Sequence, residues 1–309
     1  MGAKLKISIV TPSFNSGRFI GEAIESVRAQ SGDVGEVEQI IADAESTDDT
    51  AAVLARYPEL RIDRRPDAGI YDGINRAVSL ATGDIIGILN SDDALAPGSL
   101  LHVRERFEAE PTDVLTGAFQ VMDVGGVKLP SEYIPQSTPS VTGLLFGIPA
   151  INARFFNRDA FRKAGPFDLT FPLAADRVWL VQACRAGLNF RHTARNLYYY
   201  RKHDSSRTLA GDYRTRTRVW REHVSVAQAL LANSGSDQQL ARALQSWQAL
   251  ELTKLLIAGE PAMSEGSSRR GRFSAARDLR RLGIRAPVAL ATGIANWLRF
   301  RGRHSDILG

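Results

Sequence analysis

Several features are absent from the 309-residue sequence, and each absence excludes a class of protein or site. Cys184 is its only cysteine, so neither an intramolecular disulfide nor a cysteine metal cluster can be built. No apolar signal segment precedes the first expected strand. The longest uncharged run near the C-terminus, residues 286–298, is interrupted by Pro287 and Gly293 and is shorter than the roughly 20 residues that span a bilayer. These absences favour a globular protein of the cytoplasm.

Glycine-rich phosphate loops are also absent. The chain has neither a Gly-x-Gly-x-x-Gly fingerprint nor a Walker A sequence, although it contains 26 glycines. A bound diphosphate would therefore need another source of positive charge, and a divalent cation held by carboxylates is the remaining device. The hydrophobic content of 44% and charged content of 24% are ordinary for a globular protein, and the net charge of +5 is modest.

Strand and helix patterns alternate four times over residues 1–110. Short apolar runs that suit buried strands are followed by segments with helical apolar spacing. This alternation predicts a parallel sheet with right-handed crossovers, and therefore an α/β fold. The expected strands are 6–11, 37–42, 60–63 and 85–89, and the expected helices are 18–30, one that Ser46 would cap and that runs to about 56, one that runs to about 81, and 99–109.

The pattern changes after residue 110. Short β-like runs are expected at 114–116 and 119–121, a loop at 136–149, a strand at 153–156, a helix at 178–186 and a last strand at 197–200. Beyond residue 212 the apolar spacing is helical throughout. We therefore predict a catalytic domain over residues 1–212, with halves 1–110 and 111–212, and a helical extension over residues 213–309.

The most distinctive stretch is the central strand, 85–89, with the polar residues that follow it. Asn90, Asp92 and Asp93 emerge at the carboxyl end of this strand, where ligands bind in parallel sheets. Two adjacent carboxylates repel each other unless a cation joins them, and hard oxygen ligands suit Mg²⁺ or Mn²⁺. The alternative is that the acidic pair opens a turn or caps the next helix.

Four ordered segments resemble the family 2 glycosyltransferases of GT-A fold. They are residues 11–15 (TPSFN), 41–48 (IADAESTD), 67–75 (DAGIYDGIN) and 81–93 (ATGDIIGILNSDD). A later block, residues 155–176, is similar to the acceptor side of that family. The resemblance covers about residues 5–208 and implies a Rossmann-like, mostly parallel sheet flanked by helices, with a nucleotide-diphosphate sugar as donor and an inverting mechanism.

The resemblance also implies roles for individual residues. The first two segments would hold the nucleotide base and ribose, the next two would line the sugar and diphosphate pocket, and an acid on the acceptor side would be the catalytic base. The nucleotide-sugar residues would be Thr11, Pro12, Phe14, Asn15, Asp43, Asp67, Asn75, Asn90 and Ser91, the Mg²⁺ or Mn²⁺ ligands Asp92 and His203, and the base Asp176.

Three departures from the family pattern bear on these roles. Ala44-Glu45 stands where Asp-Gly is usual, Asn90 replaces an acid and removes one charge from the metal site, and Ala175 replaces a glutamate before the base. Alternatives stay open: Asp176 as a helix cap, His203 as a loop residue, and residues 201–203 as a phosphate-binding cluster. Residues 198–200, three tyrosines, are expected to pack in a strand.

Competing functions follow from the same residues. A nucleotidyltransferase would also use a doubly wound sheet and acidic metal ligands, but the lysine-bearing glycine loop that it needs is missing. An inactive protein that only binds sugar nucleotides is another alternative. Nucleic-acid binding is disfavoured because the basic charge is confined to the tail and no matching fold motif is present.

The C-terminal tail combines basic and apolar residues. Beside an apolar helix that carries aromatic residues, a dense basic stretch suits an anionic lipid surface. We therefore expect a peripheral position at the inner face of a membrane, close to a saccharide or lipid-linked acceptor; the alternative is that the apolar positions pack on the catalytic domain. The arginines are Arg269, Arg270, Arg272, Arg277, Arg280, Arg281 and Arg285, and the apolar residues are Ile284, Val288, Leu290, Ile294, Trp297, Leu298 and Phe300.

Overall fold

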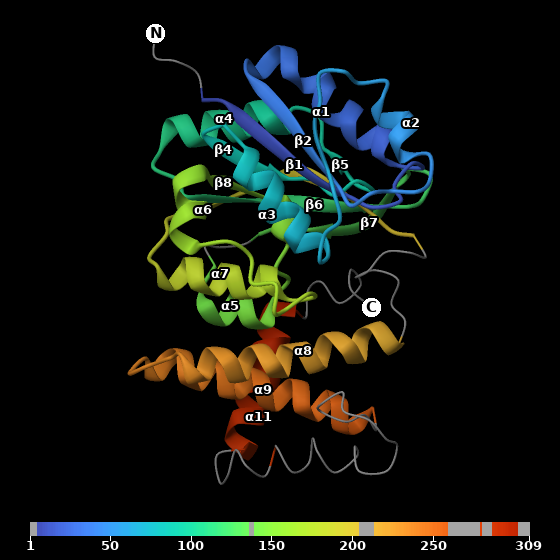
Figure 1. The fold of residues 1–309 in the computed structure, drawn as a ribbon. Helices are drawn as coiled ribbons and strands as arrows, with labels where there is room; N and C mark the ends of the chain where they lie inside the picture. The colour runs from blue at the N-terminus through green and yellow to red at the C-terminus, as the bar shows by residue number, and fades with distance from the viewer. Residues whose placement is uncertain (1–4, 136–138, 204–212, 259–278, 280–285, 302–309) are drawn as a thin grey trace. The chain divides into compact units, whose positions relative to one another are not determined.

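A computed structural model describes residues 5–135, 139–203, 213–258, 279 and 286–301 (Figure 1). Its internal contacts divide the chain into two compact units. The first contains residues 5–135, 150–172 and 182–203, and the second contains residues 139–149, 173–181 and the described residues from 213 onward. Each unit is described by itself below.

The first unit is built on a mixed sheet whose first half is parallel. Its strands are β1 (Ile7–Ser13), β2 (Val37–Asp43), β3 (Arg61–Arg64) and β4 (Ile85–Ile88), in the order β3-β2-β1-β4. Each neighbouring pair in this order is parallel. The apolar side chains of β1 and β4 are fully buried, as expected for strands covered on both faces. The predicted α/β fold is confirmed.

Three helices connect these strands, whose carboxyl ends lie at one edge because the strands run parallel, and a fourth helix follows β5 (Ala94–Leu95). The four helices are α1 (Ile20–Val34), α2 (Thr50–Leu54), α3 (Ile70–Leu80) and α4 (Ser99–Ala109). Helix α3 lies across β1 and β2 (Figure 1). Ile20 and Ile24 of α1 pack with Ile41 of β2 and Leu54 of α2 in one buried cluster. This packing fixes the loops that follow β1 and β2.

The second half of the sheet is largely antiparallel. Strand β8 (Arg154–Asn157) pairs antiparallel with β4 and with β6 (Val114–Met122), and β9 (Phe190–Arg201) runs parallel to β6. The short strand β5 (Ala94–Leu95) and β7 (Lys128–Tyr133) pair antiparallel with β9 and β6. A 3₁₀ turn (Ile151–Ala153) precedes β8 and helix α6 (Arg158–Ala164) follows it. The antiparallel strands close the sheet around the end of β4.

Three sequence expectations for the second half need correction. The two short runs at 114–116 and 119–121 are one continuous strand, β6, which passes close to Leu197 at Gly117; a Cβ there would lie 2.3 Å from the Leu197 side chain. Strand β9 begins at Phe190, earlier than the expected 197–200. Residues 139–149 are not all loop, since they contain helix α5 (Val141–Phe146), whose first turn the Ser140 hydroxyl caps.

The expected helix cap at Ser46 is also wrong. Helix α2 begins at Thr50, and the Ser46 hydroxyl instead donates a hydrogen bond to Asp43 Oδ1 at 2.5 Å. The Thr50 hydroxyl and amide both bond to Asp48. Ser46 therefore belongs to the loop that follows β2 and not to the helix.

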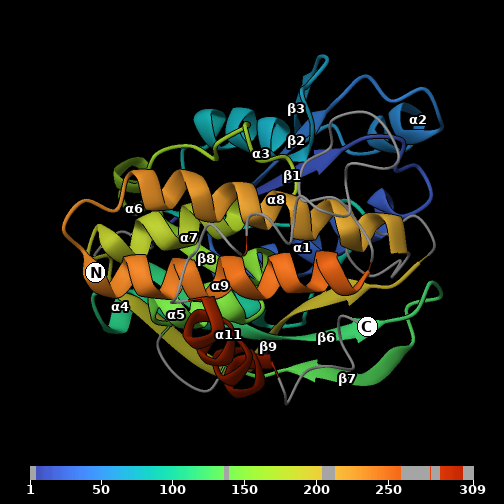
Figure 2. The same ribbon diagram turned by 90° about the horizontal axis from the view of Figure 1, so that it is seen from below.

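The second unit is helical. It contains α5, the start of α7 (Ala175–Arg185), α8 (Tyr213–Ala232), α9 (Gln238–Ile257) and α11 (Ala286–Arg301). Helices α8 and α9 lie side by side and α11 packs across α9 (Figure 2). Gly293 allows the close crossing, because a Cβ there would lie 2.5 Å from the Ser246 carbonyl oxygen. Helix α11 is continuous through Pro287 and Gly293, two residues expected to weaken a helix at this position.

The tail is described only in part. The basic stretch of arginines, Ile284 and the side chain of Phe300 lie outside the described residues. Within α11, Val288, Ile294 and Leu298 are exposed. Within the described part of the chain, no helix has the length and apolar character that crossing a membrane requires.

Candidate active site

The two acids that follow β4 have different surroundings. Asp93 is buried and accepts hydrogen bonds from the Tyr198 hydroxyl at 2.6 Å and from the Arg201 amide at 2.7 Å. Burial, together with the charge of Asp92, raises the pKa of Asp93 well above its usual range. Asp93 is therefore bonded to β9 and does not cap helix α4, which has no side-chain cap.

Asp92 is half-buried and faces a histidine. Its Oδ2 lies 2.9 Å from Nε2 of His203, and its carbonyl oxygen accepts from Arg201 Nε at 2.7 Å. The His203 ring packs against Phe19, with centroids 5.1 Å apart. Asp92, which follows β4, and His203, which follows β9, thus lie in contact. The resemblance implied that both would bind the metal ion.

Asn90 lies two residues before Asp92 in the loop that follows β4. Its Nδ2 donates to Asp93 Oδ2 at 3.2 Å, which directs Oδ1 away from Asp93. That Oδ1 is buried and has no hydrogen-bond partner among the described residues. An amide oxygen, a carboxylate and an imidazole are donor types that suit Mg²⁺ or Mn²⁺.

The cluster 201–203 is not a free phosphate site. Arg201 is 1% exposed, its Nη2 lies 2.5 Å from Glu22 Oε2, and its guanidinium lies over the Phe19 ring. Its charge is therefore committed within the first unit, and only Lys202 of the three is exposed. The phosphate-binding alternative is wrong for Arg201.

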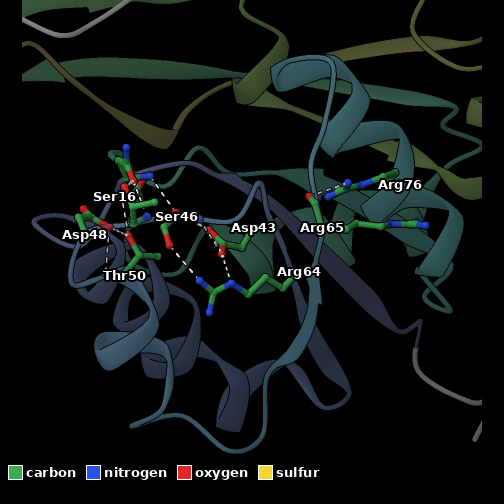
Figure 3. A network of polar contacts seen from close by, with 10 residues as sticks. Ser16, Asp43, Ser46, Asp48, Thr50, Arg64, Arg65 and Arg76 are labelled. Atoms are coloured by element: carbon green, nitrogen blue, oxygen red, sulfur yellow. Dashed lines mark hydrogen bonds and ion pairs between the residues drawn. The ribbon is translucent and has the colours of Figure 1, made fainter.

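Hydroxyl groups link the loops after β1, β2 and β4 at one edge of the sheet. Figure 3 shows Ser16 and Ser46 of the first two loops together with Asp48 and Thr50. Ser16 Oγ lies 2.7 Å from Ser91 Oγ, and the Ser16 amide donates to Thr50 Oγ1 at 2.8 Å. The Asn15 amide donates to Ser46 Oγ, and Asn15 Oδ1 accepts from the Thr47 amide. The loops after these three strands therefore meet at one edge of the sheet, where the carboxyl ends of parallel strands lie.

The remaining residues of the first segment differ in access. Thr11 and Pro12 lie inside β1, and the Thr11 hydroxyl is buried and accepts from Gln39 Nε2 at 3.1 Å. Phe14 is 62% exposed at the edge of the sheet, and Asn15 adopts a left-handed φ of 50°. The exposed ring of Phe14 offers a surface on which a base could stack.

Asp43 is held by a partner that the sequence alone did not indicate. Its carboxylate is fully buried, accepts from the Ser46 amide and hydroxyl, and lies 3.3 Å from Arg64 Nε (Figure 3). Arg64 Nη2 also donates to the Ser46 carbonyl oxygen at 2.9 Å. Glu45 takes the left-handed φ of 59° at the position where the resemblance expects glycine.

Asp67 and Asn75 are separated by the start of α3. Asp67 Oδ1 accepts from the Gly69 amide at 2.9 Å, and Gly73 approaches Asp67 so closely that a Cβ would lie 3.1 Å from Oδ2. The Asn75 amide bonds at both ends to the backbone of Phe167, at 2.9 Å each. Asn75 therefore links α3 to the turn before residue 168.

Asp176 stands in the first turn of α7, in the second unit. Its Oδ1 accepts from the Arg177 amide at 2.7 Å. Arg177 is buried, and its guanidinium donates to the carbonyl oxygens of Leu145 and Gly147 at the end of α5. Glu222 of α8 accepts hydrogen bonds from the amides of Leu173 and Ala174, which precede α7.

No group of three carboxylate, imidazole or thiol side chains gathers among the described residues to hold a metal ion. Asp92, His203 and Oδ1 of Asn90 are the donors that the first unit offers. A metal ion held by these residues would need further oxygen ligands, such as those of a phosphate group.

A family model decides the classification. The model described as Glycosyl transferase family 2 matches residues 8–164, just over half of the chain. The chain belongs to glycosyl transferase family 2. It is therefore a glycosyltransferase, and the matched residues include all of the first unit's candidate residues except His203.

Known relatives agree with this assignment. An uncharacterized glycosyltransferase of Nostoc sp. is 26% identical over 225 residues, which is 67% of this chain and 67% of the relative. A PGL/p-HBAD biosynthesis glycosyltransferase of Mycobacterium tuberculosis is 28% identical over 184 residues, covering 55% of this chain and 66% of the relative. The aligned part thus spans about two-thirds of the length of each relative.

Solved structures of glycosyltransferases share the fold. The structure of S. aureus TarS 1–349 in complex with UDP-GlcNAc has a TM-score of 0.67 at 17% identity and covers 98% of this chain and 92% of that chain. The mannosyltransferase PcManGT of Pyrobaculum calidifontis, in complex with GDP-Man and Mn²⁺, has a TM-score of 0.56 at 18% identity, covering 98% and 84%. The family 2 chain therefore has the GT-A fold.

Proposed function

We propose that this glycosyltransferase moves a sugar from a nucleotide-diphosphate sugar to a saccharide or lipid-linked acceptor, with a divalent metal ion and inversion at the anomeric carbon. The observation that carries the metal-dependent donor site is the Asp92–His203 pair at the end of the central strand, and the buried Asn90 oxygen without a partner among the described residues, two residues before Asp92, supports it. Similar structures bind UDP-GlcNAc, or GDP-Man with Mn²⁺, which supports a nucleotide-sugar donor.

Residues of the first unit have defined tasks in this proposal. Phe14, Asn15 and Asp43 contact the nucleotide base and ribose. The donor pocket is lined by Asp67, Asn75 and Ser91, together with the buried strand residues Thr11 and Pro12. Asp92, His203 and Asn90 would hold Mg²⁺ or Mn²⁺. When bound, such an ion neutralises charge that develops on the leaving diphosphate.

The second unit supplies the proton acceptor. Asp176 takes the proton from the acceptor hydroxyl as that oxygen attacks the anomeric carbon, while the bond to the diphosphate breaks. A carboxylate at the start of a helix is held in place by backbone amides, here by the Arg177 amide. A single displacement of this kind inverts the anomeric configuration.

The acceptor class is argued from relatives and from the tail. The similar mycobacterial proteins are named PGL/p-HBAD biosynthesis glycosyltransferases, which supports an acceptor in cell-surface glycolipid or polysaccharide synthesis. The alternative of a nucleotidyltransferase has no support from the family match. Binding of the tail to an anionic membrane surface is proposed with the lipid-linked acceptor.

A panel of nucleotide-diphosphate sugars tests this function. Each sugar is scored with Mn²⁺ for release of the nucleotide diphosphate and for thermal stabilisation of the protein. We expect one donor to give both signals. Stabilisation without turnover, in the presence of a range of saccharide and lipid-linked acceptors, would favour the inactive sugar-nucleotide-binding protein instead.

A further inference from the structure

Glu222 of helix α8 reaches the start of helix α7. Its Oε1 accepts hydrogen bonds from the amides of Leu173 and Ala174, at 2.6 and 2.8 Å. Helix α7 begins directly afterwards, because the Val178 amide bonds to the Ala174 carbonyl oxygen at 3.1 Å. These two amides precede the helical hydrogen-bond ladder and need an outside partner. One carboxylate oxygen from the C-terminal extension satisfies both.

The same contact places a second negative charge beside Asp176. Glu222 is half-buried; its burial and the neighbouring charge of Asp176 raise its pKa above the usual range, against the effect of its two amide bonds and of Arg218. Repulsion between two carboxylates is mutual, so the negative charge of Glu222 also acts on Asp176. His223, whose pKa lies at about 4, adds no charge near neutral pH.

The start of α7 is also fixed from its other side. Arg177 donates to the carbonyl oxygens at the end of α5, and its guanidinium lies 5.5 Å from the centroid of Trp247 in α9. Glu222 and Arg177 together hold the backbone on both sides of Asp176. The first turn of α7 therefore depends on α5, α8 and α9, of which α8 and α9 lie beyond the segment that the family model matches.

We propose that Glu222 is a positioning residue for the catalytic base: it fixes the helix start that carries Asp176 and places a negative charge near the Asp176 carboxylate. The inference rests on the proposed function, in which Asp176 takes the acceptor's proton. In this inference the C-terminal helices hold the catalytic base Asp176 in position, in addition to packing with one another.

Two substitutions separate the geometric effect from the charge effect. Glu222→Gln keeps an oxygen that can accept from both amides and removes the negative charge. Glu222→Ala removes both. Gln228→Ala, at an exposed position of the same helix, is the matched control. For each protein, kcat, donor KM, the pH profile of kcat/KM and the thermal midpoint are measured.

The charge effect has a definite sign. With Glu222→Gln, Asp176 loses its repelling neighbour, so the acidic limb of the pH profile moves down by about one pH unit. The rate on the plateau falls several-fold because the base is weaker. Donor KM stays at the wild-type value. With Glu222→Ala the helix start is also released, and kcat falls by about tenfold or more.

Each other outcome overturns the inference. An unshifted acidic limb for Glu222→Gln removes the charge effect. A loss of rate in Glu222→Ala that only follows a lowered thermal midpoint leaves Glu222 as a structural residue. Glu222→Gln is nearly isosteric and keeps the test valid if the alanine variant does not fold. Failure of the proposed function is seen separately, as wild-type turnover in Asp176→Asn.

Discussion

At the scale of single residues, the neighbouring acids Asp92 and Asp93 divide two tasks. Asp93 accepts from Tyr198, Arg201 and Asn90 and is buried, whereas Asp92 keeps an accessible carboxylate beside His203. The first is held within the fold, and the second is available to the proposed metal ion. This division explains why two acids can stand side by side at the end of a buried strand.

Asp93→Ala is expected to destabilise the first unit by roughly 3 kcal/mol. The change leaves the buried Tyr198 hydroxyl and the Arg201 amide without their acceptor, and unsatisfied buried donors are among the costliest single changes. Denaturant unfolding followed by circular dichroism measures the loss. A variant with wild-type stability would show that Asp93 does not hold β9 to the end of β4.

Asp176→Asn is nearly isosteric and cannot take a proton. We expect kcat to fall by at least about 10²-fold, a typical contribution of a general base, while nucleotide-sugar binding survives. Steady-state kinetics and donor titration measure the two effects separately. Loss of donor binding together with the rate would instead make Asp176 a donor-site or structural residue.

The candidate residues could be found from the sequence only where a motif marks them. Asp92 and Asn90 follow a buried strand, which gives a clear signal. No such signal marks Arg64, which pairs with Asp43, or Tyr198, which bonds to Asp93. Their partners lie 21 or more residues away along the chain. Glu222 is a single acid on a helix whose apolar spacing indicates packing alone.

At the scale of elements, the helices α8 and α9 enclose a buried charged group. His223 Nδ1 lies 3.5 Å from Glu251 Oε2, and Lys254 Nζ lies 2.7 Å from Glu251 Oε1. Burial lowers the pKa of His223 to about 4, and the neighbouring Lys254 and His223 hold that of Glu251 far below its usual range. The helix pair is therefore sensitive to acid.

Acidification to pH 5 should weaken this helix pair through His223. Unfolded His223 gains a proton below about pH 6.5, whereas folded His223 does not until about pH 4, so proton uptake favours the unfolded state between these values. The His223 contribution between pH 7.5 and 5 is at most about 2 kcal/mol. Glu251 adds its own loss only below about pH 4.5.

His223→Gln isolates this contribution. Glutamine does not titrate, so the variant should lose less stability than the wild type between pH 7.5 and 5. The raised pKa values of Glu222 and Asp93 act in the opposite direction, but they do so in both proteins. Denaturant midpoints at the two pH values give the difference. Equal losses in both proteins would rule out His223 as the acid-sensitive group.

The elements themselves were predictable where local pattern and burial agree. The first four strands and α4 follow directly from apolar spacing, and all lie within the expected ranges or differ by a few residues. Helix α5 was missed because Ser140, Gly143 and Gly147 indicate a loop. Its stability comes from Arg177, which caps its carbonyl groups, and from buried Leu144 and Phe146, and none of these contacts is local.

At the scale of the whole molecule, the tail remains a proposed membrane contact. Val288, Ile294 and Leu298 are exposed on α11, while Gly293 lies against α9, so this helix both packs and leaves apolar side chains uncovered. The arginines that precede it, at 269–285, supply positive charge in the sequence. Each such charge near an anionic surface contributes roughly 1 kcal/mol.

Vesicle flotation tests this contact. Full-length protein should float with anionic vesicles at low salt, and recovery should fall at high salt and with neutral vesicles, because surface attraction is screened. A protein carrying Val288→Ser, Ile294→Ser and Leu298→Ser, and one with the seven arginines changed to glutamine, should each float less. Equal recovery of all three proteins on anionic vesicles would leave the tail as packing alone.

The central claim is a metal-dependent nucleotide-sugar site at Asp92. Its most direct test is calorimetric titration of the nucleotide diphosphate with and without Mn²⁺, together with turnover of the donor identified in the panel, for wild type and Asp92→Ala. Binding by the wild type should strengthen with Mn²⁺. Asp92→Ala should fold normally, lose this metal-dependent gain and lose transfer. An Asp92→Ala protein that keeps the Mn²⁺ effect and the wild-type rate would contradict the account.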